Sequence, residues 1–192
     1  MKKMTTLAAA SVLMAGSAFA QVSGTLGTSS EADVSVEATI AKMVRIGGLD
    51  GLMEVAIDAA RLNSNFGQSR ESQRFCVYSN VNSTGDYLVE ISSSNPRGPN
   101  GNPYVLTNGT ENLNYYVHFN DDFANPFNFI NPGIQYSRST TAGGLPRPTD
   151  LDCGNVSGGE NAELVVGFRN SQVLAVPAGT YSGMLTITVS AP

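Results

Sequence analysis

Apolar and polar residues alternate along much of this 192-residue chain, and a period of two predicts β-strands with one buried face. The clearest run extends from Asp33 to Ile46, where most even positions are apolar and most odd positions are polar. Its apolar face comprises Val34, Val36, Ala38, Ile40, Val44 and Ile46. Further strands are expected at Leu52–Asp58, Arg74–Ser79, Tyr87–Ser92, Leu113–Asn120, Glu163–Arg169 and Tyr181–Ser190. A helix over Glu54–Leu62 is the alternative in that region.

These strands are joined by polar linkers without helical crossovers, so the sequence predicts an all-β fold, an antiparallel β-sandwich. One connection, Asp121–Asp152, is unusually long and contains four prolines with interleaved aromatic residues. It is either a binding loop, a loop held to the sandwich by its aromatic side chains, or a segment that contains a further strand around Tyr136.

The N-terminus has the layout of a secretory signal peptide. Lys2 and Lys3 precede an apolar run from Leu7 to Phe19, and Ala18-Phe19-Ala20 is a small-residue cleavage pattern. The run is shorter than the ~20 apolar residues that span a bilayer. We therefore expect residues 1–20 to be removed and the mature chain to begin at Gln21, be exported, and not insert into a membrane. An uncleaved anchor or a buried helix is the alternative.

The charge balance argues against nucleic acid as a partner. The chain has 11 basic and 16 acidic residues, a net charge of −5, and loss of Lys2 and Lys3 makes it −7. The remaining arginines are scattered singly and form no basic run in the sequence.

Two cysteines, Cys76 and Cys153, are retained in the mature chain. An even number in an oxidising compartment predicts one disulfide between them. Metal binding is a weaker interpretation because there is no CxxC pattern and His118 is the only histidine. Two free thiols are a still weaker interpretation in an oxidising compartment.

Candidate catalytic groups are few. His118 lies on a predicted strand, opposite the face of Tyr115, Val117 and Phe119, and we expect it to be solvated. The sequence lacks GxSxG and HExxH motifs. The acidic pairs Asp121-Asp122 and Asp150/Asp152 either serve turn chemistry or bind calcium or act as an acid/base pair. We expect no enzyme activity and no cofactor.

The C-terminal segment Val176–Val189 resembles the closing strand of pilin subunits assembled by the chaperone–usher pathway, with Gly179 and Tyr181 as its turn and Gly-x-Tyr step. Three further stretches resemble strands of the spore-coat-U-like, archaic branch of these pilins: Phe75–Asn80, Tyr87–Ile91 and Tyr115–Asp121. The chain departs from the family in two ways. Ala191 replaces the usual penultimate tyrosine, and the first strand lacks the cysteine that this branch pairs with its second-strand cysteine.

This resemblance implies an immunoglobulin-like sandwich, residues 32–192, that lacks one strand and exposes an apolar groove with an unpaired edge. A periplasmic chaperone would fill the groove first, and at an outer-membrane usher the N-terminal extension of a neighbouring pilin subunit would replace it. The donor would lie in residues 21–31, with Val22, Gly24, Leu26 and Thr28 alternating. The acceptor groove would be lined by Val34, Val36, Ile40, Leu185, Ile187 and Val189.

The resemblance thus implies a structural fimbrial subunit in a surface fibre for adhesion or biofilm formation, in the fimbrium of a Gram-negative bacterium. The alternative is a free-standing secreted β-sandwich that binds a carbohydrate or a protein through its loops.

Overall fold

The computed structural model describes residues 23, 25–58, 68–95, 104–123 and 128–192. Contacts divide the chain into two units, Met1–Ile40 and Ala41–Pro192. In the first unit, the described residues form no helix or strand and are exposed. The predicted signal peptide, residues 1–20, lies outside the described residues. The described part of the chain contains no helix that is long and apolar enough to cross a membrane.

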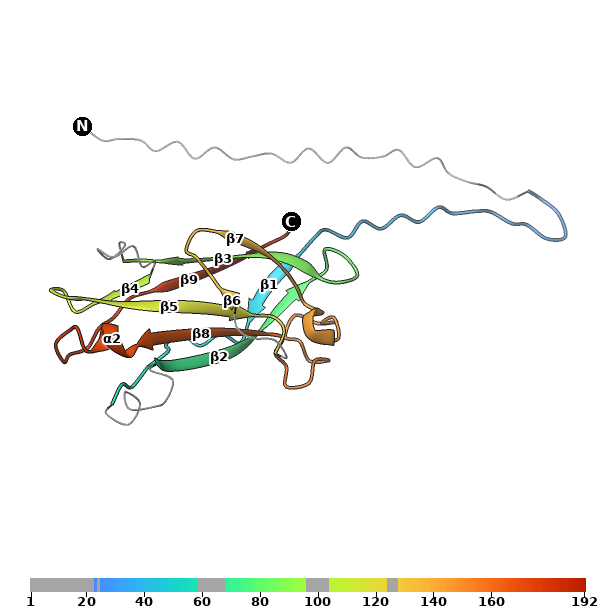
Figure 1. Cartoon of the computed structure of the whole chain (residues 1–192). Helices are drawn as coiled ribbons and strands as arrows, with labels where there is room; N and C mark the ends of the chain where they lie inside the picture. The colour runs from blue at the N-terminus through green and yellow to red at the C-terminus, as the bar shows by residue number, and fades with distance from the viewer. Residues whose placement is uncertain (1–22, 24, 59–67, 96–103, 124–127) are drawn as a thin grey trace, which may run out of the picture. The chain divides into compact units, whose positions relative to one another are not determined.

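Two antiparallel sheets form the second unit (Figure 1). The larger has the order β1-β2-β8-β5-β4, with β6 also paired to β5, and the smaller has the order β7-β3-β9. The strands of the larger sheet are β1 (Val44–Gly47), β2 (Gln68–Ser79), β4 (Tyr104–Thr107), β5 (Asn112–Asn120), β6 (Asn128–Phe129) and β8 (Ala162–Arg169). Those of the smaller sheet are β3 (Asp86–Ser93), β7 (Gln135–Ser139) and β9 (Leu185–Ser190). The described residues also form a short 3-10 helix η1 (Ala142–Gly144) and one helical turn α2 (Asn170–Val173).

Alternating residues of both sheets form one core, which confirms the all-β, immunoglobulin-like sandwich. On β5, Leu113, Tyr115, Val117 and Phe119 face inward. The inner face of β8 contributes Ala162, Leu164, Val166 and Phe168, and β3 contributes Tyr87, Val89 and Ile91. Five predicted strands are found, as β2, β3, β5, β8 and β9. The further strand suggested around Tyr136 is β7.

The prediction of a long first strand, Asp33–Ile46, is wrong for most of its length. Only Val44–Gly47 is a strand, and Val44 pairs with Ser79, the last residue of β2. The described residues before Val44 have no ladder partner among the described strands, and alternation alone cannot supply one. The other end is fixed by Gly48, whose φ of +74° turns the chain away from the sheet.

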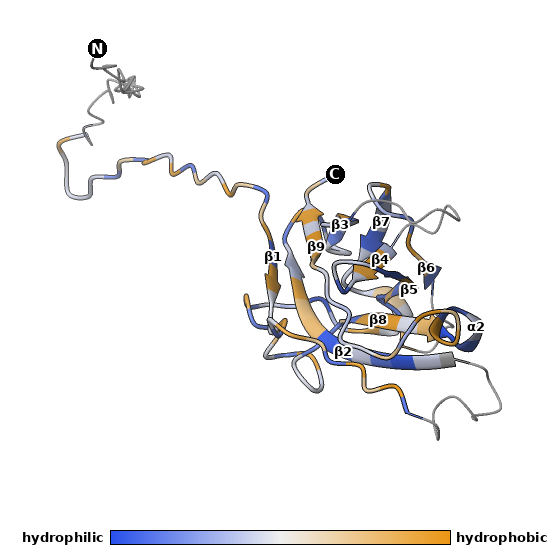
Figure 2. Ribbon diagram, turned by 90° about the vertical axis from the view of Figure 1, so that its left-hand side faces the viewer, coloured by the Kyte–Doolittle hydropathy of each residue, from blue (hydrophilic) through white to orange (hydrophobic). Residues whose placement is uncertain are grey.

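The segment between β1 and β2 is also not a strand where it is described. Leu52–Asp58 makes no ladder with a described strand, nor does it form the alternative helix. Its burial still alternates: Met53, Val55 and Ile57 are half-buried against the core. In Figure 2 this stretch leads from β1 to the grey segment before β2 as a largely apolar tube. We call residues 49–57 the β1–β2 segment.

The predicted disulfide is confirmed. Cys76 and Cys153 are bonded, with their Cα atoms 5.8 Å apart. Both are buried, and with Val156 and the half-buried Leu145 they form a small second cluster that holds the connection before β8 against β2.

Candidate functional site: an open groove beside the last strand

β9 has a ladder partner on one side only among the described strands. It pairs with β3 from Leu88↔Ser190 to Ser93↔Leu185, and it is the last strand in the order β7-β3-β9. Its other edge presents backbone N–H and C=O groups that no described strand pairs. An unpaired edge of this kind is a template for another strand.

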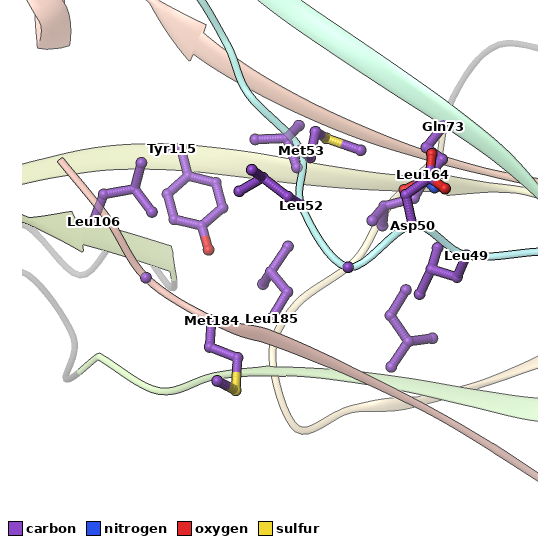
Figure 3. Close-up of a pocket in the computed structure, with 14 residues that line it drawn as sticks. Leu49, Asp50, Leu52, Met53, Gln73, Leu106, Tyr115, Leu164, Met184 and Leu185 are labelled. Atoms are coloured by element: carbon purple, nitrogen blue, oxygen red, sulfur yellow. The ribbon is translucent and has the colours of Figure 1, made fainter. Parts of the chain in front are cut away.

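One cavity lies beside β9, and a second lies beside the residues that lead into it. One has a volume of about 270 Å³ and the other about 520 Å³, and they share Leu52, Met53, Leu106 and Gly183. Since four residues line both cavities, we describe them as one groove. Figure 3 shows the smaller cavity, with Leu52 and Met53 on one side and Met184 and Leu185 on the other.

The floor of the groove is the inner face of the larger sheet. Tyr115 of β5 and Leu164 and Val166 of β8 line the smaller cavity, and Leu113 and Phe168 line the larger one. Burial raises the pKa of Tyr115 to about 12, partly opposed by a hydrogen bond with Ser93. The phenol therefore stays neutral at physiological pH, and the floor is uncharged and largely apolar.

One wall is β9 and the residues that lead into it. Leu185 and Ile187 line the smaller cavity, while Gly179 and Tyr181 line the larger. The Tyr181 hydroxyl donates to the Pro177 carbonyl at 2.8 Å, which holds the turn before the strand. β9 begins at Leu185 rather than at the predicted Tyr181. Val189 is half-buried and packs against the core without lining either cavity.

The other wall is the β1–β2 segment. Val34, Val36 and Ile40 are 80%, 90% and 81% exposed in the first unit, and their place in an acceptor groove stays a prediction. Leu49, Leu52 and Met53 line the smaller cavity. The alternation at Leu52–Asp58 was the signal that could have identified this wall.

Of the predicted donor residues, Val22 and Gly24 lie outside the described residues. Leu26 and Thr28 are exposed in the first unit.

The candidate catalytic groups take part in ring packing, an ion pair and turn hydrogen bonds. His118 is 9% exposed, so the expectation of a solvated side chain is wrong; its ring lies 4.0 Å from that of Phe129. Asp121 forms an ion pair with Arg138 at 3.8 Å and accepts a hydrogen bond from the Ser139 N–H. Asp150 accepts from the N–H groups of Asp152 and Gly154, which is turn chemistry. Within the described ranges, no three potential metal ligands cluster.

The aromatic residues of the long connection have different surroundings. The guanidinium of Arg74 lies 4.4 Å from the ring centre of Phe123, and Tyr136 packs against the core from β7. Phe129 is 61% exposed, and Phe127 lies outside the described residues. The interpretation that aromatic side chains hold this connection to the sandwich therefore fits Phe123 and Tyr136 but not Phe129.

No protein-family model matches the chain, and no curated protein matches its sequence. Among solved structures, it is similar to a chain from a chaperone–tip adhesin complex described as vital for synergistic activation of CFA/I fimbriae biogenesis. The TM-score is 0.49 at 13% identity, and the match covers 78% of this chain and 41% of that one. This chain thus spans less than half of that protein's length. A function for this chain rests on its own geometry.

Proposed function

We propose that this protein is a structural fimbrial subunit whose groove beside β9 takes an extended strand from a neighbouring subunit. The observation that supports this is a β9 edge that no described strand pairs, with a largely apolar groove beside it. An added strand would pair with the β9 backbone, and its alternate side chains would enter the groove. Such a head-to-tail contact does not close on itself, so it builds a fibre.

The donor strand comes from the N-terminal extension. The sequence suggests Val22, Gly24, Leu26 and Thr28 within residues 21–31. The structure supports a second donor candidate, residues 32–41, because Val34, Val36 and Ile40 alternate there and are almost fully exposed. Burying each of these side chains contributes about 1.5–3 kcal/mol, whereas Gly24 and Thr28 contribute little.

The proposed partners follow from the same groove. A periplasmic chaperone covers it during export, and an outer-membrane usher exchanges the chaperone for the next subunit. The finished fibre lies at the cell surface and serves adhesion or biofilm formation. Membership of the spore-coat-U-like branch is a prediction from the sequence.

The test uses the purified chain from Gln21 to Pro192, produced in the periplasm without partners, and measures thermal unfolding and size-exclusion elution. Synthetic peptides covering residues 21–31 and 31–42 are added in turn. We expect the chain alone to be marginally stable or self-associated, and one peptide to raise its Tm and yield a single 1:1 species. A 31–42 peptide carrying Val36→Asp is the matched control and should not rescue.

The groove itself is tested by Ile187→Asp, which places a charge on the groove wall and should abolish the peptide effect. Thr188→Asp puts the same charge on the exposed side of β9 and should preserve it. A chain that is monomeric, unfolds sharply and is indifferent to both peptides would overturn the proposal. That result would favour the free-standing carbohydrate- or protein-binding module instead.

A further inference from the structure

The outer face of the larger sheet carries a group of rings away from the groove. Tyr116 and His118 of β5 alternate with the core residues, and Phe129 of β6 pairs opposite His118. The Tyr116 ring centre lies 6.0 Å from that of Phe129, at an interplanar angle of 66°. Phe129 is 61% exposed, so this aromatic group is open to solvent.

Tyr116 is held close to the sheet by the residue beside it. It pairs with Gly167 of β8, and a Cβ at Gly167 would collide with the Tyr116 ring. The absent side chain therefore lets the ring lie against the β8 backbone. A ring fixed in this way loses little conformational entropy when a ligand stacks on it.

A pocket of about 190 Å³ opens beside these rings. It lies between the places where β4 and β6 pair with β5: Tyr104 of β4 pairs with Tyr115, whereas β6 pairs with β5 only from His118 onward. Its lining combines aromatic rings with planar polar side chains: Tyr104, Tyr115, Tyr116, Phe129, Asn131, Arg169 and Gln172. The volume is below the ~300–1,000 Å³ of pockets that enclose drug-sized ligands, so it suits a single ring.

Two guanidinium groups flank Tyr116. Arg169 lines the pocket, and Arg70 pairs with Gly167 from β2, so that Arg70, Gly167 and Tyr116 form one row across three strands. Burial raises the pKa of Tyr116, and the charges of Arg70 and Arg169 oppose that rise, which places both cations near the phenol. This positive corner stands out on a chain whose net charge is −5.

We infer that this pocket binds a carboxylated sugar, such as a uronic or sialic acid residue of a surface glycan. The C–H face of a pyranose stacks on the exposed ring of Phe129, and the Tyr116 ring, inclined at 66° to it, borders the sugar. The Arg169 guanidinium binds the carboxylate, because its planar array of N–H donors matches the two oxygens of that group. The side-chain amides of Gln172 and Asn131 hydrogen-bond to the sugar hydroxyls. Tyr115 lines both this pocket and the groove, whereas the residues assigned to the sugar lie outside the groove lining.

The test measures binding of three monosaccharides, glucuronic acid, N-acetylneuraminic acid and galactose, to the Gln21–Pro192 chain by saturation-transfer NMR and calorimetry. We expect one or both acids to bind more tightly than galactose. Arg169→Gln should weaken binding of the acid by about tenfold to a hundredfold, because it removes a charge-assisted hydrogen bond, and should leave galactose unchanged. Phe129→Ala should weaken both kinds of sugar.

Arg147→Gln removes the same charge from an exposed loop arginine that does not line the pocket, and it should bind like the parent chain. Circular dichroism and thermal unfolding confirm that each variant is folded. The inference is overturned if neither acid binds, if Phe129→Ala and Arg169→Gln leave acid binding intact, or if an acidic peptide of six glutamates binds while the sugars do not.

Discussion

The disulfide provides the largest single stability prediction for this protein. Cys76 and Cys153 are 77 residues apart, and the chain-entropy model assigns a loop of that length about 4.5 kcal/mol at 25 °C. The same connection is also held to β2 by Asn161, which hydrogen-bonds to both backbone groups of Val77. The cysteine cluster is small, and the nearby ion pair from Arg45 to Asp152, 3.4 Å, is exposed and worth little.

The assay is urea unfolding of the Gln21–Pro192 chain with and without reductant, followed by circular dichroism. Any instability from the open groove affects both states and cancels in the comparison. We expect reduction to lower the free energy of unfolding by about 4.5 kcal/mol. It should also raise the slope of that free energy against urea concentration, because the reduced unfolded chain expands.

Reduction is preferable to substitution because it leaves both side chains in place and changes only the crosslink. A loss of unfolding free energy below about 1 kcal/mol, with an unchanged urea slope, would refute the prediction, since the crosslink would then not constrain the unfolded chain.

Three further predictions concern packing, a buried amide and alkaline pH. Gly167→Ala should cost about 1–3 kcal/mol in chemical unfolding because its methyl group meets the Tyr116 ring, and adding Tyr116→Ala should restore part of that loss. Asn161→Ala should cost about 3 kcal/mol, because the buried amide accepts from the Val77 N–H at 2.7 Å and donates to its carbonyl at 2.9 Å. Burial raises the pKa of Tyr115 to about 12, so its contribution to stability is complete below pH ~10 and is lost as pH rises toward 12; absorbance titration should show late tyrosine ionisation coupled to unfolding.

Each of these has a distinct contrary outcome. A Gly167→Ala chain as stable as the parent would mean that the Tyr116 ring does not lie against β8. An Asn161→Ala loss below 1 kcal/mol would mean that the Val77 backbone groups find other partners. Ionisation of Tyr115 near pH 10 without unfolding would contradict its burial.

The alternating pattern located most of the sandwich because, in core strands, the apolar positions in the sequence are the positions that are buried. The inward residues of β3, β5 and β8 alternate in sequence as they do in space, and these strands were predicted within a few residues. The disulfide was also predictable, since two cysteines admit only one intramolecular pair. β4 and β6 were not predicted, because they are short and follow turn-rich stretches.

The sequence by itself determined the strand-forming stretches, the cysteine pair and the period of two in residues 33–46. Only the tertiary structure decided which of these stretches find partners. Val34, Val36 and Ile40 have the pattern of a core strand, yet they form no strand and are exposed, whereas Val44–Gly47 of the same stretch pairs with β2. The groove beside β9 arises in the same way, because its floor, its walls and its unpaired edge come from segments distant in sequence. Alternation indicates which side chains are apolar enough to be buried. A β-ladder also requires a partner strand, and the whole fold decides whether one is present.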